Sequence, residues 1–324
     1  MSDAALQFDN IAFKDDARAQ ENFRAALIEG LSRKNKSIPC RFLYDAAGSA
    51  LFDKICETPE YYVTRAEMEI LRAHAGDMAA LAGPDCQLIE LGSGSSRKTR
   101  VLLDALEHPG SYVAIDISGD HLRLSASALA HHYPQLRVTA LCADYNEPLV
   151  LPPYAGVGRR LGFFPGSTIG NLTPEEALTL LSAWARQLGR NAAMVVGVDL
   201  KKDVSVLEAA YDDAEGVTAA FTKNILARAN REAGANFVTA NFAHEARYVP
   251  QRGCMEIHLR SLAEQKIFFS GRTVAFGLNE RIHIENSFKY SVPEFQELAV
   301  AAGFVAQDVW TDKEGRFSVH YLTV

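Results

Sequence analysis

A glycine-rich turn at residues 92–96 says more about the fold than any other segment. Three of the five residues before it, Gln87–Leu91, are apolar, and two of these are adjacent, which is typical of a strand buried on both faces of a sheet. The residues after it, from about Lys98 to Leu106, have helical spacing. Glycines between a strand and a helix let backbone amides approach a ligand, and the N-terminus of the helix favours negative charge there.

Strands and helices keep alternating after this turn. Apolar segments predict further strands at residues 112–116, 137–141, 160–164 and 192–200. One helix start is well marked, because Thr173 can cap it and is followed by Pro174 and two glutamates. The alternation predicts an α/β fold with a parallel, doubly wound sheet.

The alternation stops at Lys201. Residues 205–233 have mainly helical spacing, and residues 237–285 contain segments that are typical of antiparallel strands. A helix at 292–302 and a strand at 317–322 then return to the α/β pattern.

A further helix is expected upstream of the glycine turn. Thr64 and Glu67 have the spacing of a capping box, in which each side chain satisfies a free backbone N–H at the helix start. The pattern therefore predicts a helix from Arg65 to about Ala75.

Composition narrows the class of protein. Of the 324 residues, 48% are hydrophobic and 23% are charged, which is typical of a globular chain. The net charge of -7 argues against a nucleic-acid surface. No apolar run has the length of a membrane span, and the N-terminus lacks the apolar core of a signal peptide. We therefore expect a cytoplasmic monomer with neither a nucleic-acid nor a membrane partner.

The cysteines and histidines do not indicate a metal site. The five cysteines are scattered and form no C-x-x-C pair, so neither a disulfide framework nor a zinc site is expected. No acidic residues and histidines cluster with the spacing of metal ligands.

The residues around the turn separate two classes of cofactor. A dinucleotide site needs a third glycine where this chain has Arg97, and no Tyr-x-x-x-Lys pair is present, so a nicotinamide oxidoreductase is disfavoured. Acidic residues occur on three successive strands instead. Glu90 suits the amino group of S-adenosylmethionine, Asp116 its ribose hydroxyls and Asp144 its adenine amino group.

We therefore expect S-adenosylmethionine as the cofactor. The expected binding residues are Gly92, Ser93, Gly94, Lys98, Asp116, Asp144 and Tyr145. A nucleoside-binding module without catalysis is the alternative at this point.

Five long segments make the assignment more specific. They read FLYDAAGSALFDKICETPEYYVTRAE, LIELGSGSSRKTRVLLDAL, FFPGSTIGNLTPEEA, VDLKKDVSVLEAAYDDAEGVTAAF and IHIENSFKYS. Through them the chain, from about Lys36 to Val324, resembles the histidine N-alpha-methyltransferases of ergothioneine synthesis. The resemblance implies a Rossmann-like class I methyltransferase sheet with a second, smaller α+β lobe for the substrate. We place the cofactor domain at residues 62–200 and 289–324, and the substrate lobe at 1–61 and 201–288.

The resemblance also implies which residues hold an amino acid. Glu285 and Ser287 match a pair that hydrogen-bonds an imidazole, and alternate residues of a strand share a face. Asn171 matches a contact for the carboxylate and the amine, and Tyr211 matches a contact for the carboxylate. Tyr61 is a further match, although the sequence does not separate it from Tyr62. Met255 matches a residue of the pocket wall, and Tyr44 and Phe52 match aromatic residues near the methyl-receiving nitrogen.

The implied reaction transfers methyl groups from S-adenosylmethionine to the α-amino group of L-histidine, three times, and gives the betaine hercynine. An in-line displacement requires approach geometry and an unprotonated amine. We expect Tyr44 and Asn171, with water, to orient the lone pair and take part in proton removal. The alternative is an N-methyltransferase of another amino acid such as tryptophan, although indole would favour an apolar residue in place of Glu285.

Overall fold

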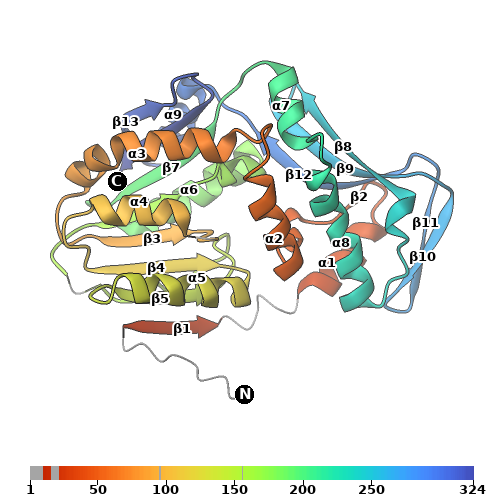
Figure 1. Cartoon of the computed structure of the whole chain (residues 1–324), viewed down its shortest axis with the longest axis horizontal. Coiled ribbons are helices and arrows are strands. Elements are labelled where there is room, and N and C mark those ends of the chain that lie inside the picture. The colour runs from red at the N-terminus through yellow and green to blue at the C-terminus, as the bar shows by residue number, and fades with distance from the viewer. Residues whose placement is uncertain (1–9, 16–21, 95, 155) are drawn as a thin grey trace.

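The structure is a computed structural model that describes residues 10–15, 22–94, 96–154 and 156–324. It has a large lobe built on an eight-stranded sheet and a smaller lobe built on a four-stranded sheet, side by side in Figure 1. The large sheet is mostly parallel and is flanked by helices, so the predicted α/β fold class is confirmed.

The large sheet has the spatial order β1-β5-β4-β3-β6-β7-β14-β13. Its strands are β1 Ile11–Asp15, β3 Gln87–Leu91, β4 Ser111–Asp116, β5 Arg137–Cys142, β6 Arg160–Phe164, β7 Ala193–Asp199, β13 Val305–Thr311 and β14 Phe317–Thr323. The six strands from β1 to β7 in this order pair in parallel, and β14 pairs antiparallel with both β7 and β13. The chain order reverses at β3, and ligands bind doubly wound sheets at the carboxyl ends of the strands beside such a point.

Helices cover both faces of this sheet. They are α3 Val63–Ala82, α4 Arg97–Ala105, α5 Gly119–His132, α6 Pro174–Leu188 and α9 Val292–Ala301, with a 3-10 turn, η3 Thr168–Asn171. Leu88 lies in a core with side chains of α3, α4 and α5, whereas its neighbour Ile89 lies in a separate core with side chains of α6 and α9. This explains why β3 is apolar at successive positions. Among the helices that the structure describes, none is both long and apolar enough to cross a membrane.

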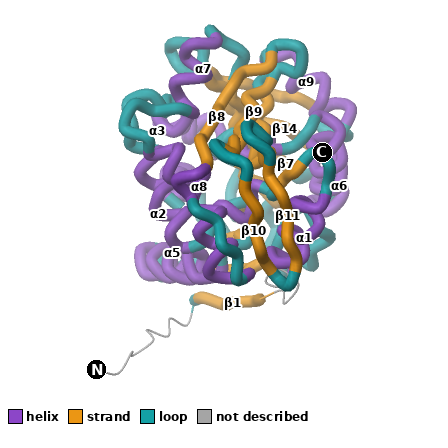
Figure 2. The backbone as a smooth tube through the Cα atoms, turned by 90° about the vertical axis from the view of Figure 1, so that its right-hand side faces the viewer, coloured by secondary structure: helices purple, strands orange, loops and turns teal. Residues whose placement is uncertain are grey.

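The smaller lobe combines the N-terminal region with residues that follow β7. Its helices are α1 Asn22–Ser32, α2 Ala46–Ile55, α7 Val204–Tyr211 and α8 Val217–Ala233, with 3-10 turns η2 Cys40–Leu43 and η4 Thr239–Asn241. Its sheet has the order β2-β12-β9-β8, formed by Lys36–Ser37, Arg281–Phe288, Cys254–Ser261 and Phe242–Val249. A hairpin of β10 Gln265–Phe269 and β11 Arg272–Phe276 projects beside α8 (Figure 2).

Two expectations from the sequence need correction. Strand β1 pairs with β5, with Ile11 opposite Val138, so this segment belongs to the large sheet and not to the substrate lobe. Helix α3 begins at Val63, and no side chain caps it, so the capping box at Thr64 and Glu67 was wrong. Glu67 is fully buried and pairs with more distant groups. The capping box at Thr173 is present as expected.

Candidate active site

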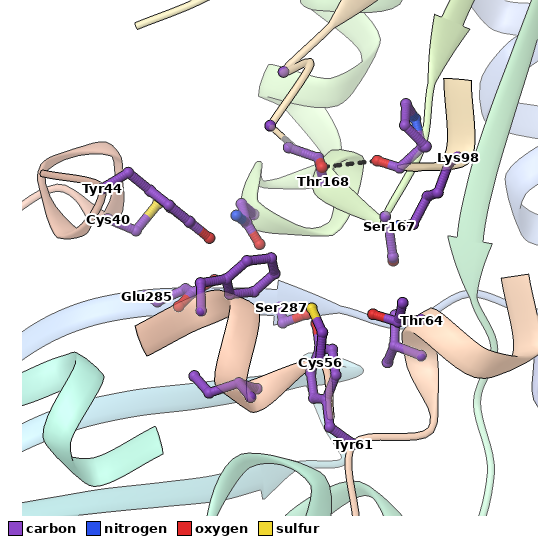
Figure 3. Close-up of a pocket in the computed structure, with 18 of the residues that line it drawn as sticks. Cys40, Tyr44, Cys56, Tyr61, Thr64, Lys98, Ser167, Thr168, Glu285 and Ser287 are labelled. Carbon is purple, nitrogen blue, oxygen red and sulfur yellow. Dashed lines mark hydrogen bonds between the residues drawn. The ribbon is translucent and has the colours of Figure 1, made fainter. Parts of the chain in front are cut away.

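A cavity of about 1330 Å³ lies between the two lobes, where the strands of the large sheet end. Figure 3 shows Tyr44 and Cys40 on one side of it, Lys98 and Thr168 on the other, and Glu285 and Ser287 on the strand between them. The residues expected to bind cofactor or substrate that line it are Tyr44, Phe52, Tyr61, Gly92, Ser93, Gly94, Lys98, Asp116, Asp144, Tyr145, Asn171, Tyr211, Glu285 and Ser287. The fold thus brings these residues together from both lobes.

The glycine turn and Asp116 form one end of this cavity. Gly92 and Gly94 have φ values of 74° and 45°, which glycine adopts without strain. The backbone N–H of Gly94 donates to Asp116 Oδ2 at 3.1 Å, and that of Ser118 donates to Oδ1 at 2.9 Å. Burial raises the pKa of Asp116, although these backbone donors oppose the shift. Each carboxylate oxygen keeps a lone pair for another donor, such as a ribose hydroxyl.

Further groups at this end also fit a nucleoside cofactor with a charged amino-acid tail. The Ser93 hydroxyl is buried without a hydrogen-bond partner among the described residues, so it is free to contact a ligand. Asp144 Oδ1 accepts hydrogen bonds from the backbone and side-chain nitrogens of Asn146, and its Oδ2 lies 4.0 Å from Arg41 Nε. Tyr145 packs edge-on against Phe164 with ring centroids 5.5 Å apart. The carboxylate of Asp144 and the aromatic ring of the adjacent Tyr145 can together hold an adenine.

Glu90 is more constrained than the sequence suggests. Its Oε2 accepts hydrogen bonds from the hydroxyls of Thr99, at 2.6 Å, and Tyr112, at 2.5 Å. Burial raises the pKa of Glu90 to about 8, against the effect of these two hydrogen bonds. Its other oxygen, Oε1, is the one left for an amino group.

Lys98 is held by a buried partner that the sequence did not indicate. Its Nζ lies 2.5 Å from Glu67 Oε2, and the carboxylate of Glu67 also accepts the backbone N–H of Gly166 at 2.9 Å. A Cβ atom at Gly197 would lie 2.1 Å from Glu67 Oε1, so β7 needs a glycine there for the carboxylate to fit. The contacts join α3, α4 and the loop after β6 beneath the cavity.

Aromatic rings form the wall contributed by the smaller lobe. Tyr44 and Phe52 pack edge-on at 5.5 Å between centroids, Phe52 and Tyr61 at 6.2 Å, and Tyr61 and Tyr211 at 6.2 Å. Phe221 packs against Tyr44 at 5.4 Å. Burial raises the pKa of Tyr44 well above its ordinary value, so its phenol is neutral. A ring of aromatic faces of this kind suits a cationic group.

Two polar residues of β12 face this aromatic wall. Glu285 has no hydrogen-bond partner among the described residues, and burial raises its pKa to about 7, with Lys289 opposing the shift. The Ser287 hydroxyl lies 2.8 Å from the Tyr211 hydroxyl. Lys289 Nζ donates to both of these hydroxyls at 2.8 Å. The strand thus presents a free carboxylate beside a hydrogen-bonded pair of hydroxyls.

The structure separates the two adjacent tyrosines. Tyr61 lines the cavity. Tyr62 lies behind it, where its hydroxyl donates to the Asp199 carboxylate at 2.9 Å. Tyr61 is therefore the one that can contact a ligand.

Met255 lies elsewhere than expected. It is fully buried, pairs with Ser287 across the sheet and is not among the residues that line the cavity. Ile257, two residues along on the same face and opposite Glu285, does line it. The wall position beside the carboxylate is thus Ile257.

The sequence reading missed four residues around the site: Glu67, Asp199, Phe221 and Lys289. Phe221 had a usable signal, because it ends the segment VDLKKDVSVLEAAYDDAEGVTAAF, which carries the family resemblance. The other three are charged and buried, and each has a partner far away in the chain: Glu67 pairs with Gly166, and Asp199 pairs with Lys289. Among the described residues, no group of three or more His, Cys, Asp or Glu side chains is placed to hold a metal ion.

Comparisons with known proteins agree over nearly the whole chain. A family model described as "Histidine-specific methyltransferase, SAM-dependent" matches residues 23–324. The chain is 40% identical to "Histidine N-alpha-methyltransferase" of Mycobacterium tuberculosis over 91% of this chain and 93% of that protein. It is also 40% identical to the protein of that name in Mycolicibacterium smegmatis, over 93% and 94% of the two chains. "Ergothioneine biosynthesis protein 1" of Neurospora crassa is 30% identical, over 85% of this chain and 32% of that protein.

Proposed function

The chain belongs to the family of SAM-dependent, histidine-specific methyltransferases, and we propose that it methylates the α-amino group of L-histidine. We further propose three successive transfers, which give the trimethyl betaine hercynine, as a step of ergothioneine biosynthesis. The names of the relatives support the substrate and the pathway. The proposed binding partner is therefore a small molecule, the amino-acid substrate. The same proposal includes that the protein is cytoplasmic and monomeric.

One observation carries this function most directly. A single cavity holds the glycine turn and Asp116 at one end, and Glu285 beside the Ser287 and Tyr211 hydroxyls at the other. A cofactor with a ribose and an amino acid with an imidazole can therefore be bound at the same time in this one cavity. Positioning of this kind supplies much of the rate in a bimolecular displacement.

The residues have separate parts in this reaction. When bound, S-adenosylmethionine supplies a methyl group on a positively charged sulfur. The side chains of Asn171 and Tyr211 hold the amino-acid backbone of the substrate, and Glu285 accepts a hydrogen bond from its imidazole N–H. These contacts fix the position of the α-amine relative to the glycine turn.

Tyr44 has the role of orienting the amine. Its raised pKa keeps a proton on the hydroxyl, so the oxygen accepts a hydrogen bond from an amine N–H without acting as a phenolate base. The proton released before each transfer passes to water in the cavity. The faces of Tyr44, Phe52 and Tyr61 accommodate the growing methylammonium group through cation–π contacts.

The test is an incubation of the protein and S-adenosylmethionine with all twenty amino acids, followed by mass spectrometry. We expect mass increases of one, two and three methyl groups on histidine alone. Methylation of tryptophan instead would support the alternative within the family. Absence of any methylated amino acid, in protein that binds S-adenosylhomocysteine, would refute the proposed substrate class.

A further inference from the structure

A buried lysine lies behind the two hydroxyls of the substrate site. Lys289 directly follows β12 and is fully buried. Its Nζ lies 2.8 Å from the Tyr211 hydroxyl, 2.8 Å from the Ser287 hydroxyl and 2.6 Å from Asp199 Oδ2. An ammonium group has three N–H bonds, so each of them has a partner.

These contacts determine what the two hydroxyls offer to a ligand. An ammonium can only donate, so the oxygens of Tyr211 and Ser287 both accept from Lys289. The hydroxyls also lie 2.8 Å from each other, and one of them donates to the other. One hydroxyl hydrogen is used inside this triangle, and the second one is left to donate outward into the cavity.

The charged groups behind the two hydroxyls also suit a ligand atom that accepts a hydrogen bond. Asp199 is shared by Lys289 and by Lys202, whose Nζ lies 2.6 Å from its Oδ1. Burial opposes the charge on Lys289, but Asp199 and Tyr211 outweigh it and raise the pKa of Lys289. Burial lowers the pKa of Lys202 to about 8, with Asp199 opposing. Two ammonium groups therefore share one carboxylate, and the cluster is net positive near neutral pH.

We propose that Lys289 is a positioning residue for the amino-acid substrate: it holds Tyr211 and Ser287 so that the pair donates one hydrogen bond to an acceptor atom of the ligand. The inference rests on the proposed function, because the acceptor is then a carboxylate oxygen or the unprotonated nitrogen of the imidazole. Glu285, which can only accept when ionised, addresses the opposite need of the ring, its N–H.

The contacts would also fit a purely structural role, because Asp199 ends β7 and Lys289 follows β12, so the ion pair joins the two lobes. The two roles differ in what the lysine acts through. A lysine that only joins the lobes affects catalysis whether or not the hydroxyls are present. A lysine that acts through the hydroxyls loses its effect when they are removed, so the two changes are not additive.

The experiment is a double-mutant cycle read as kcat/KM for histidine. Lys289→Met keeps the length of the side chain and removes its donors, while Asp199 retains Lys202 and Tyr62 as partners. We expect this change to lower kcat/KM at least about tenfold in the otherwise unchanged protein, since hydrogen bonds from a charged group are lost. In a chain that already carries Tyr211→Phe and Ser287→Ala, the same change should lower it less than about threefold.

Two controls accompany the cycle. Binding of S-adenosylhomocysteine by calorimetry should stay within about twofold of the unchanged protein, which reports an intact cofactor site. Lys201→Met removes an exposed lysine that pairs with Glu294, and it should leave kcat/KM unchanged. If the Lys289→Met variant does not fold, Asp199→Asn is combined with it so that both charges are removed together. This double change then takes the place of Lys289→Met in the unchanged protein and in the chain that carries Tyr211→Phe and Ser287→Ala.

The outcomes are distinguishable. Equal losses in the two backgrounds, or no loss in the first one, would overturn the role of Lys289 while leaving histidine as the substrate. If the unchanged protein binds S-adenosylhomocysteine but does not methylate histidine, the proposed function fails first and the inference falls with it.

Discussion

The carboxylate of Glu67 accepts a hydrogen bond from the backbone N–H of Gly166 at 2.9 Å, although the two residues are 99 positions apart. Glu67 comes from α3, and Gly166 lies in the loop that leads from β6 to Asn171. The same carboxylate pairs with Lys98 of α4. One buried acid therefore holds the loop that carries Asn171 in place relative to the start of α4.

Glu67→Ala should destabilise the protein by about 3 kcal/mol or more, because it leaves a largely buried ammonium and a backbone N–H without their partner. Urea denaturation gives the free energy of unfolding. Asp77→Ala, on the same helix, removes an exposed pair with His74 and should cost less than about 1 kcal/mol. Similar losses in the two variants would contradict the role given to Glu67.

Asp116→Ala should weaken binding of S-adenosylhomocysteine by about 1.5–3 kcal/mol, the typical cost of losing a hydrogen bond to a charged group. Calorimetry measures the affinity, and Asp308→Ala, which removes an exposed acid of β13, is the matched control. Tight binding of NADH, without any binding of S-adenosylhomocysteine, would refute the cofactor assignment.

Asn171→Ala and Tyr211→Phe should each lower kcat/KM for histidine and for its mono- and dimethyl derivatives alike. The reason is that both residues are proposed to hold the part of the substrate that these amino acids share. A loss of about tenfold corresponds to roughly 1.4 kcal/mol of transition-state stabilisation. Turnover close to that of the unchanged protein in either variant would remove that residue from the site.

Glu285→Ala should lower kcat/KM for histidine at least about tenfold and relax the preference over tryptophan. A site built to hydrogen-bond a substrate group rejects analogues that lack it, because its polar group would be left unpaired. Adding Ile257→Val, which widens the wall opposite Glu285, should admit indole further. The assay is methyl incorporation with both amino acids in competition. A preference for histidine that stays unchanged would show that Glu285 does not contact the ring.

Glu285 should also make stability depend on pH. Burial raises its pKa from 4.5 to about 7 in the folded chain. The stability that it contributes is therefore fully present below about pH 4.5 and is lost as the pH rises through about 7. Glu285→Gln lacks this titration, so its Tm should rise relative to that of the unchanged protein across this window. Thermal unfolding without ligand at a series of pH values measures the difference, and a constant difference would argue against a buried carboxyl.

Local patterns in the sequence were sufficient for the framework of the fold. The glycine turn after an apolar strand predicted the cofactor end of the sheet, and the structure has Gly92 and Gly94 at positive φ there. Thr173 with Glu176 predicted a helix start, and the capping box is present. These features depend on residues within one or two turns of each other, so their spacing is visible in the chain itself.

Contacts between distant segments were not visible in this way. Glu67 has the spacing of a capping residue, yet it pairs with Gly166 and Lys98. Its carboxylate is buried away from solvent, and these two residues are the donors that lie within reach in the packed structure. Likewise, only the packed lobes decide that Tyr61 faces the cavity while Tyr62 pairs with Asp199. A buried charge takes whichever partner the tertiary structure places within reach, since leaving it unpaired costs several kcal/mol, and the sequence does not record that distance.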